Sequence, residues 1–530
     1  MSSTLDTAAP ETGGHGHRHL GAALAIISIA QLMVVLDATI ANIALPYISD
    51  DLSFTPGNQT WIITGYTLAF GGLLLLGGRL GDMFGRRRIF ILGVLVFAVA
   101  SLLGGISQNQ ELLLASRALQ GLGAAIASPT ALALITTTFP AGKERNRAFA
   151  VYAAMSGAGA AVGLILGGWL TEYSWRWTFL INVPIGVAAA VLAPMFLAES
   201  KPRRIKLDLP GAFSGTVGLL GVVYGLTRGA DLVAKNADKT WTDPWVLLAL
   251  IGGAALLVSF IAIERVVKEP LMPFHILADR TRGTSFAVMM LVPAAMFAMF
   301  YFLSIIIQDG MGYSPLRAGF AFLPFTFGIV ASAGIASNLM ARVDPRWLAG
   351  LGTVLAGVGL FGFSRIPYDD SVGNLSVTAS YLPDLLPWIL VMSFGMGFVF
   401  VPLTLTAVHG VSNDDSGIGS GVLNAMQQVG GALGLAILST VAVQAATDKG
   451  EEIGAAAQAG APANAPPPSE EQARAFGEAV QNVAFAHGST WAFVVGAFMI
   501  WAGAVITFLF MNVSHEDIND VETPAGVPVS

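Results

Sequence analysis

Long apolar segments recur along the whole chain, and this repetition limits the possible folds more than any other feature. Most are close to the length of about 20 residues that a helix needs to cross a bilayer core of about 30 Å. In the 530-residue sequence 54% of residues are hydrophobic and 12% are charged, against about 25% charged in soluble domains. Lipid offers the backbone no hydrogen bonds, and the segments lack the alternation of β-barrel strands. We therefore expect an all-α membrane protein that crosses the bilayer many times.

The hydrophobicity pattern predicts fourteen transmembrane helices. Their approximate bounds are residues 20–46, 58–78, 88–107, 110–138, 146–172, 177–197, 208–228, 243–264, 284–308, 316–342, 346–364, 384–408, 417–446 and 489–512. The first apolar run is longer than the core of a signal peptide, so we expect it to remain as a transmembrane span.

The basic residues predict the orientation. An even number of spans places both termini on one side of the membrane, and most of the 27 lysines and arginines fall in loops on that side. Because bases are retained on the cytoplasmic side, both termini are predicted to be cytoplasmic. We expect no nucleic-acid partner, although the net charge of −7 by itself says little about partners. The absence of cysteine excludes disulfides and thiolate metal sites.

The order of the spans divides the chain into five parts. They are a cytoplasmic tail at 1–19, a six-helix bundle at 20–200, two inserted transmembrane helices and a cytoplasmic linker at 201–283, a six-helix bundle at 284–513 with an extracytoplasmic loop at 447–489, and a cytoplasmic tail at 514–530. Within that loop, Ser469 and Gln472 form a capping-box pattern that predicts a short amphipathic helix on the outer membrane surface.

Two ionisable residues lie deep inside predicted spans. A carboxylate at the position of Asp37 costs roughly 2.5 to 3.5 kcal/mol on insertion scales, so such a residue usually has a function. Arg117 is the second. A structural ion pair that locks the first span to the fourth would explain both residues. The functional alternative is that Asp37 accepts a proton or a substrate cation while Arg117 balances its charge.

Two glycine-rich stretches have different explanations. The segment from Gly78 to Arg88 joins spans two and three, and its arginines face the anionic leaflet. Glycines in span five have no preceding strand, so helix packing or bending explains them better than nucleotide binding does. No Walker sequence occurs, which argues against ATP as the energy source. The span-five glycines are Gly159, Gly163, Gly167 and Gly168.

Four motifs in order resemble the major facilitator superfamily, and in particular its fourteen-helix drug:proton antiporters of the QacA/EmrB-like branch. Residues 78–88 resemble the loop signature of the superfamily, with Met83 where a base is usual. Residues 36–46, 117–123 and 159–168, the last followed by 175–186, resemble the motifs of the antiporters. Leu164 stands where the antiporter motif usually has proline.

This resemblance implies a fold of two six-helix bundles plus two additional central helices. It implies proton coupling through Asp37 and Arg117. It also implies that Asp82 stabilises one conformation at the start of span thirteen, near residues 416–420. We predict that the acidic loop 413–415 meets Arg86 to Arg88 when the outer gate is open. The implied conformational switch comprises Gly78, Asp82, Gly85, Arg86 and Arg87.

Several side chains on spans one, two and five lie near Asp37 in sequence or in the predicted arrangement. They could line a substrate cavity, and ordinary helix contacts explain them equally well. These candidates are Gln31, Met33, Asn42, Trp61, Tyr66 and Met155.

The predicted function is proton-coupled multidrug efflux of amphipathic hydrophobic compounds, cationic or neutral, across a bacterial inner membrane. An exporter of lipid or of an endogenous metabolite is one alternative, and a non-transporting membrane sensor on the same fold is another. No nucleophile and base, metal-ligand cluster or cofactor motif appears, so we expect no enzyme activity, metal or cofactor. The expected partners are the substrate, protons and membrane lipids, and we expect a monomer.

Overall fold

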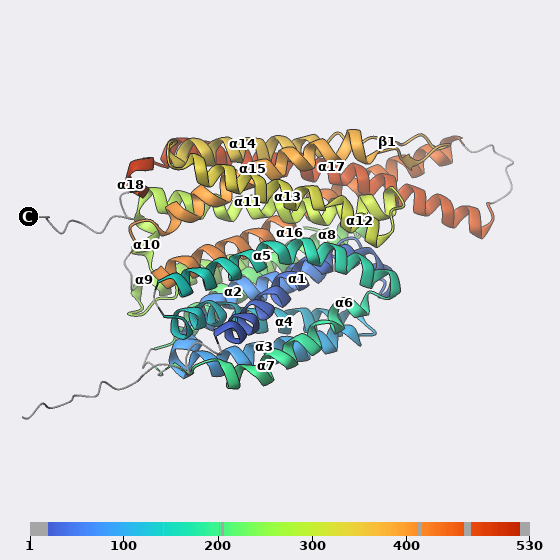
Figure 1. Ribbon diagram of the computed structural model, residues 1–530. Helices are drawn as coiled ribbons and strands as arrows, with labels where there is room; N and C mark the ends of the chain where they lie inside the picture. The colour runs from blue at the N-terminus through green and yellow to red at the C-terminus, as the bar shows by residue number, and fades with distance from the viewer. Residues whose placement is uncertain are drawn as a thin grey trace, which may run out of the picture.

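The computed structural model describes residues 20–519, apart from residues 141, 201, 203–205, 412–415 and 461–467. Within these residues the chain is helical except for loops and one short hairpin, in which β1 (Tyr368–Asp369) pairs antiparallel with β2 (Ser376–Val377). Most helices lie roughly along one direction, as transmembrane helices do (Figure 1).

Seven helices form the first bundle, in which α4 packs against α2 and α3, and α1 packs against α5 and α7. Their sequences are almost entirely apolar except at the ends, which is what a lipid environment requires. The helices are α1 (Leu20–Asp51), α2 (Trp61–Phe84), α3 (Arg86–Gly105), α4 (Gln110–Thr138), α5 (Lys143–Tyr173), α6 (Arg176–Leu180) and α7 (Asn182–Phe196).

Two further helices, α8 (Leu209–Ala234) and α9 (Pro244–Val266), form an antiparallel pair. Aspartates cap both starts, because the side chains of Asp208 and Asp243 accept hydrogen bonds from free backbone N–H groups of the first turn. Helix α8 packs against α2 and α16, whereas α9 exposes large apolar side chains such as Ile251 and Val258. These exposed side chains identify α9 as a lipid-facing helix.

The second bundle follows the short helix α10 (Phe274–Ala278). In it α14 and α13 pack against α15, and α16 packs against α11 and α17. Its elements are α11 (Arg280–Ile305), η1 (Ile306–Gly310), α12 (Pro315–Ala321), α13 (Leu323–Leu339), α14 (Pro345–Phe363), η2 (Tyr381–Leu385), α15 (Leu386–Val408), α16 (Ser416–Gly460), α17 (Glu470–Phe510) and α18 (His515–Asn519).

Thirteen helical segments within the described residues are long and apolar enough to cross a membrane. Together with α5, which has 31 residues and occupies the predicted span 146–172, they account for the fourteen predicted helices. The all-α fold class is therefore confirmed.

The structure corrects the sequence-based account of residues 447–489. Helices α16 and α17 have 45 and 41 residues and continue far beyond the predicted spans 417–446 and 489–512. The capping box at Ser469 and Gln472 is present, but it starts α17 itself and not a separate surface helix. No proline interrupts residues 447–460 or 470–510, so nothing ends these helices at the bilayer.

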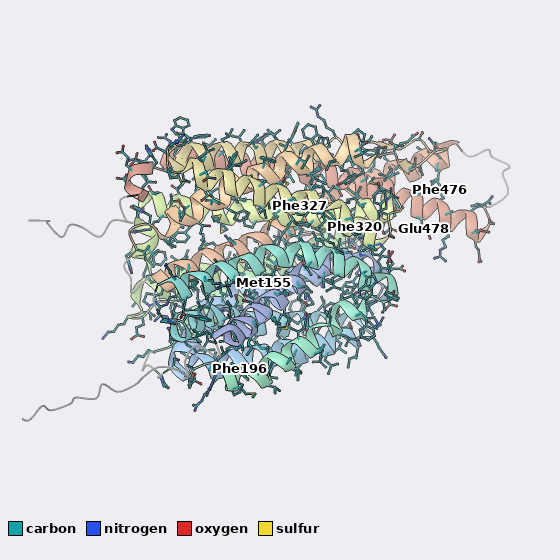
Figure 2. The ribbon with its side chains drawn as sticks, viewed as in Figure 1. Met155, Phe196, Phe320, Phe327, Phe476 and Glu478 are labelled. Atoms are coloured by element: carbon teal, nitrogen blue, oxygen red, sulfur yellow. The ribbon has the colours of Figure 1, made fainter. Side chains whose placement is uncertain are left out.

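The two ends of the molecule differ. Helix α18 and the junction between α2 and α3 lie at one end (Figure 1). The first turn of α3 carries Arg86, Arg87 and Arg88, so we call this the arginine end. The end of α16 and the start of α17 project beyond the other helices at the opposite end, the hairpin end, where Phe476 and Glu478 lie (Figure 2).

Candidate functional site

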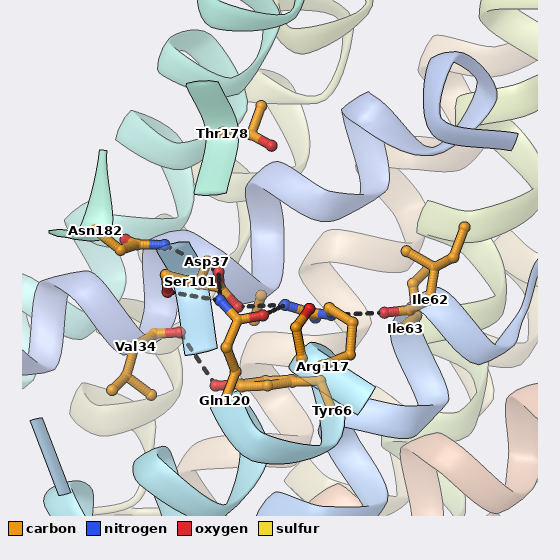
Figure 3. Close-up of polar contacts among 12 residues, drawn as sticks. Val34, Asp37, Ile62, Ile63, Tyr66, Ser101, Arg117, Gln120, Thr178 and Asn182 are labelled. Atoms are coloured by element: carbon orange, nitrogen blue, oxygen red, sulfur yellow. Dashed lines mark hydrogen bonds and ion pairs between the residues drawn. The ribbon is translucent and has the colours of Figure 1, made fainter. Parts of the chain in front are cut away.

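The structure brings the two deep ionisable residues together. Arg117 Nη1 of α4 lies 2.6 Å from Asp37 Oδ2 of α1, and the two side chains are 1% and 2% exposed. Burying a charge pair is costly unless further hydrogen bonds satisfy both groups. Residue 37 therefore faces the interior of the first bundle and not lipid (Figure 3).

Arg117 has partners besides Asp37. Its Nε donates to the backbone oxygen of Ile62 at 2.7 Å, and Nη1 also donates to Gln120 Oε1 at 2.9 Å. The guanidinium lies over the ring of Tyr66, 4.5 Å from the ring centre, and Tyr66 in turn donates to the Val34 carbonyl. These contacts would remain if Asp37 lost its charge, so Arg117 does not depend on the carboxylate alone.

Two amides complete the shell of Asp37, and sequence reasoning assigned neither of them. Gln120 Nε2 and Asn182 Nδ2 donate to Asp37 Oδ1 at 2.9 and 3.0 Å, and Gln120 also donates to Ser101 Oγ (Figure 3). Gln120 lies three residues after Arg117, so helical spacing already placed both on one face of α4. Asn182 is the first residue of α7, and no spacing rule linked it to Asp37.

The arginine end carries a second charged network. Gly85 has φ +103° between α2 and α3, a conformation that glycine adopts without strain. Arg86 forms an ion pair of 2.9 Å with Asp82 and donates to the Ala133 carbonyl of α4. Gly78 lies nearby on α2, where an added Cβ would be 3.6 Å from Pro129.

Glu199, which follows α7, was overlooked in the sequence. Its Oε1 accepts the backbone N–H of Arg87 at 3.1 Å, and Oε2 lies 3.7 Å from both Arg87 Nε and Arg88 Nε. The loop is thus fastened to the end of its own bundle. The acidic residues 413–415, predicted to meet these arginines, lie outside the described part of the chain.

The four glycines of α5 lie where this helix meets two others. Added Cβ atoms on Gly159 and Gly167 would be 3.1 Å from Leu32 and Ile40 of α1, and one on Gly163 would collide with Thr39. Gly168 faces α12. Close helix approach requires small residues at such positions.

The six candidates for a cavity lining lie in different local surroundings, and their role in substrate binding stays a prediction. Met33 is fully buried and its sulfur faces Gly186, Tyr66 lies against Arg117, and the Trp61 ring packs 6.5 Å from that of Tyr224 on α8. The other three lie on α1 and α5. Gln31 accepts from Tyr152, Asn42 accepts from Ser304 of α11 through its backbone oxygen, and Met155 lies half-buried on α5 (Figure 2).

A cavity of about 850 Å³ does occur, at the hairpin end. It lies between α1 and the following loop on one side and α11, α16 and α17 on the other. Its lining combines aromatic, amide and acidic groups, among them Tyr47, Asp50, Gln59, Tyr301, Asp309 and Gln481.

An all-helical membrane protein built from two bundles, with a buried ion pair in one and a cavity between them, has the design of a secondary transporter. Residues 27–435 match the family described as Major Facilitator Superfamily. The chain belongs to this superfamily, as its motifs predicted, and it is a transporter and not an enzyme.

Named relatives support this assignment. The chain is 43% identical over 425 residues to the puromycin resistance protein pur8 of Streptomyces alboniger, which covers 80% of this chain and 82% of that protein. It is 40% identical over 420 residues to the uncharacterized MFS-type transporter EfpA of Mycobacterium tuberculosis, with 79% and 76% covered. Identity to the cephamycin export protein CmcT of Amycolatopsis lactamdurans is 36%, with 79% and 84% covered.

Solved structures agree on the fold. A bacterial homologue of the human lysosomal transporter Spinster, in an inward-facing and occupied conformation, superposes with a TM-score of 0.60. The match covers 95% of this chain and 99% of that one at 16% identity. At this identity the likeness concerns the fold alone.

Proposed function

We propose that the protein is a proton-coupled multidrug exporter, in which Asp37 gains and loses the proton that drives transport. The observation that carries the proposal is the ion pair between Asp37 and Arg117, buried among the helices of the first bundle. The names of the relatives, which include antibiotic resistance and export proteins, support the class of substrate.

The contacts of the pair suggest how one proton changes the bundle. Protonation of Asp37 removes the charge that Arg117 Nη1 faces, while the Ile62 carbonyl, Gln120 and the Tyr66 ring continue to hold the guanidinium. Helix α1 is then bound to α4 less strongly. Because α1 also contacts α11 of the second bundle, this loosening reaches the interface between the bundles.

The cavity at the hairpin end suits substrate release. Both bundles contribute to its lining, so relative movement of the bundles would change its shape. Asp50 and Asp309 with the aromatic rings of Tyr47 and Tyr301 would accept an amphipathic compound, preferably a cationic or neutral one.

The arrangement in the membrane forms part of the proposal. The arginine end and both termini would face the cytoplasm of a bacterial cell, because Arg86, Arg87 and Arg88 lie at this end. The division at residues 200 and 284 into two six-helix bundles around an inserted pair remains our interpretation. We expect a monomer, in contact with membrane lipids.

Dye efflux in everted membrane vesicles tests the proposal. With an imposed pH gradient, the native protein should accumulate a lipophilic cationic dye, and Asp37→Asn should lose this activity while reaching the membrane at the native level. Asp51→Asn is the matched control, because Asp51 lies on the same helix and pairs with Arg176 at the surface. Normal efflux by Asp37→Asn would refute the assignment, and dye binding without movement in the native protein would indicate a sensor.

A further inference from the structure

A second buried acidic pair lies outside the Asp37 site, at the arginine end of the inserted helices. Asp208 precedes α8, Glu264 lies in the last turn of α9, and each residue is 3% exposed. Within the described part of the chain, no lysine, arginine or histidine forms an ion pair with either one. A buried carboxylate without a counter-ion is costly, so the pair needs another source of stabilisation.

Each carboxyl group has one satisfied oxygen and one unsatisfied oxygen. Asp208 Oδ1 accepts the Gly211 N–H at 2.8 Å, and Glu264 Oε2 accepts the Met272 N–H at 2.9 Å. Asp208 Oδ2 and Glu264 Oε1 are buried and receive no hydrogen bond from the described residues.

The two unsatisfied oxygens face the same point. A Cβ added to Gly211 would lie 2.3 Å from Asp208 Oδ2 and 2.7 Å from Glu264 Oε1, so both oxygens border the same small space and are at most about 5 Å apart. Two ionised carboxylates would repel each other at this separation. A single proton makes the oxygen that carries it a hydrogen-bond donor and leaves the other oxygen as the acceptor.

We propose that Asp208 and Glu264 bind a single proton between them, which forms a second proton-binding site on the inserted helices. This site is separate from Asp37, because it lies on α8 and α9 and shares no residue with the network of the first bundle. Its existence does not require the proposed antiport, but any role of this proton in transport rests on the proposed function.

The surrounding charges favour a proton over a metal ion. Among the residues that the structure describes, the charged side chains nearest the pair in sequence are those of Lys206, Arg265, Lys268 and Glu269, and all four are exposed. Arg265 lies over the Phe274 ring, and Glu269 accepts the Lys206 backbone N–H. No group of three or more acidic, histidine or cysteine side chains suited to a metal occurs in the residues the structure describes, and divalent cations prefer more ligands than two carboxyls supply.

The proton would fasten the linker that follows α9. Glu264 holds the Met272 N–H, and two residues earlier the Pro270 carbonyl accepts a hydrogen bond of 3.1 Å from Arg79 of α2. Residues 267–273 are thereby attached both to the inserted pair and to the first bundle. Loss of the proton would leave two repelling charges beneath the linker, and movement of Glu264 away from Asp208 would break its hydrogen bond with the Met272 N–H.

Infrared difference spectroscopy on the full chain in lipid nanodiscs measures the proton directly. When the pH is raised from neutral to alkaline, the native protein should lose the carbonyl stretching band of a protonated carboxyl group, because the shared proton dissociates. Glu264→Gln and Asp208→Asn should each abolish this band, because an amide can donate to the remaining carboxylate, and asparagine can still cap α8. Asp37→Asn should keep the band, so failure here is distinguishable from failure of the proposed antiport.

Hydrogen exchange at the Met272 amide supplies a second measurement. After correction for the intrinsic rate, its protection should fall with rising pH in the native protein and stay constant in Glu264→Gln. Asp243→Asn, at the opposite end of α9, should behave like the native protein and serves as the folding control. Absence of the band in the native protein, or its survival in either variant of the pair, would overturn the proposal.

Discussion

Gly168 of α5 lies directly against Pro315 of α12, so closely that a Cβ on the glycine would be 2.6 Å from the proline carbonyl oxygen. The contact is reciprocal, because a Cβ on Gly319 of α12 would collide with the carbonyl of Leu164 on α5. These two helices belong to different bundles. Their glycines therefore allow the bundles to touch near the hairpin end.

Gly168→Ala should separate α5 from α12 and favour conformations in which the bundles are apart at this end. The chain has no cysteine, so a single Leu316→Cys reports the change by its rate of maleimide labelling. We expect faster labelling in the Gly168→Ala background. Gly252→Ala on α9 is the control, since nothing lies within 4 Å of its added Cβ. Equal rates in all backgrounds would contradict the prediction.

Arg117→Met should destabilise the protein by about 3–5 kcal/mol, because it leaves Asp37 buried without a counter-charge. Adding Asp37→Asn to this variant should recover part of the loss, since the uncompensated charge is then gone. Thermal unfolding in detergent measures both effects, and the coupling follows from the double-mutant cycle. Additive losses would show that the two side chains do not interact.

Gly85→Ala should cost about 1–3 kcal/mol from backbone strain at φ +103°, and more from contact with Glu199 Oε1, which would lie 2.7 Å from the new Cβ. Gly142→Ala separates the two effects. Its φ of +107° gives similar strain, and nothing lies within 4 Å of its Cβ. Unfolding of both variants should show the larger loss at Gly85, and an equal loss would exclude the Glu199 contact as a cause.

Lys449 of α16 pairs with Asp370 beside β1 at 2.7 Å, and this hydrogen bond lowers the pKa of Asp370. The stabilisation is fully present above the ordinary aspartate pKa of about 4 and is lost as the pH falls through the lower folded value. Asp370→Asn should therefore cost roughly 0.2–1 kcal/mol at neutral pH.

Local hydrogen exchange near Asp370 as a function of pH measures this small effect. The native protein and Asp370→Asn should differ by a constant amount at neutral and mildly acidic pH and converge well below pH 4. Glu452→Gln is the comparison, because Glu452 is the other and more exposed partner of Lys449. A difference that grows on acidification would have the wrong sign and would reject the argument.

The fold class, the number of spans and the two residues at the centre of the site could all be predicted from the sequence. Apolar length is a local property, because each helix must satisfy its own backbone in lipid, and the spans could therefore be read one at a time. The deep positions of Asp37 and Arg117 followed from the same reading. The capping box at Ser469 was also local, although the helix that it starts is much longer than predicted.

Which groups share a site depends on the three-dimensional packing of the helices and could not be predicted from the sequence. Asn182 is 145 positions from Asp37 in the sequence, and Glu199 is 112 positions from Arg87. No helical periodicity predicts contacts between residues so far apart in the chain. The pairing of Asp208 with Glu264 depends likewise on how α8 and α9 end beside each other. Contacts of this kind arise from the packing of whole helices, whose relative positions are set by many apolar surfaces together and not by the residues that meet.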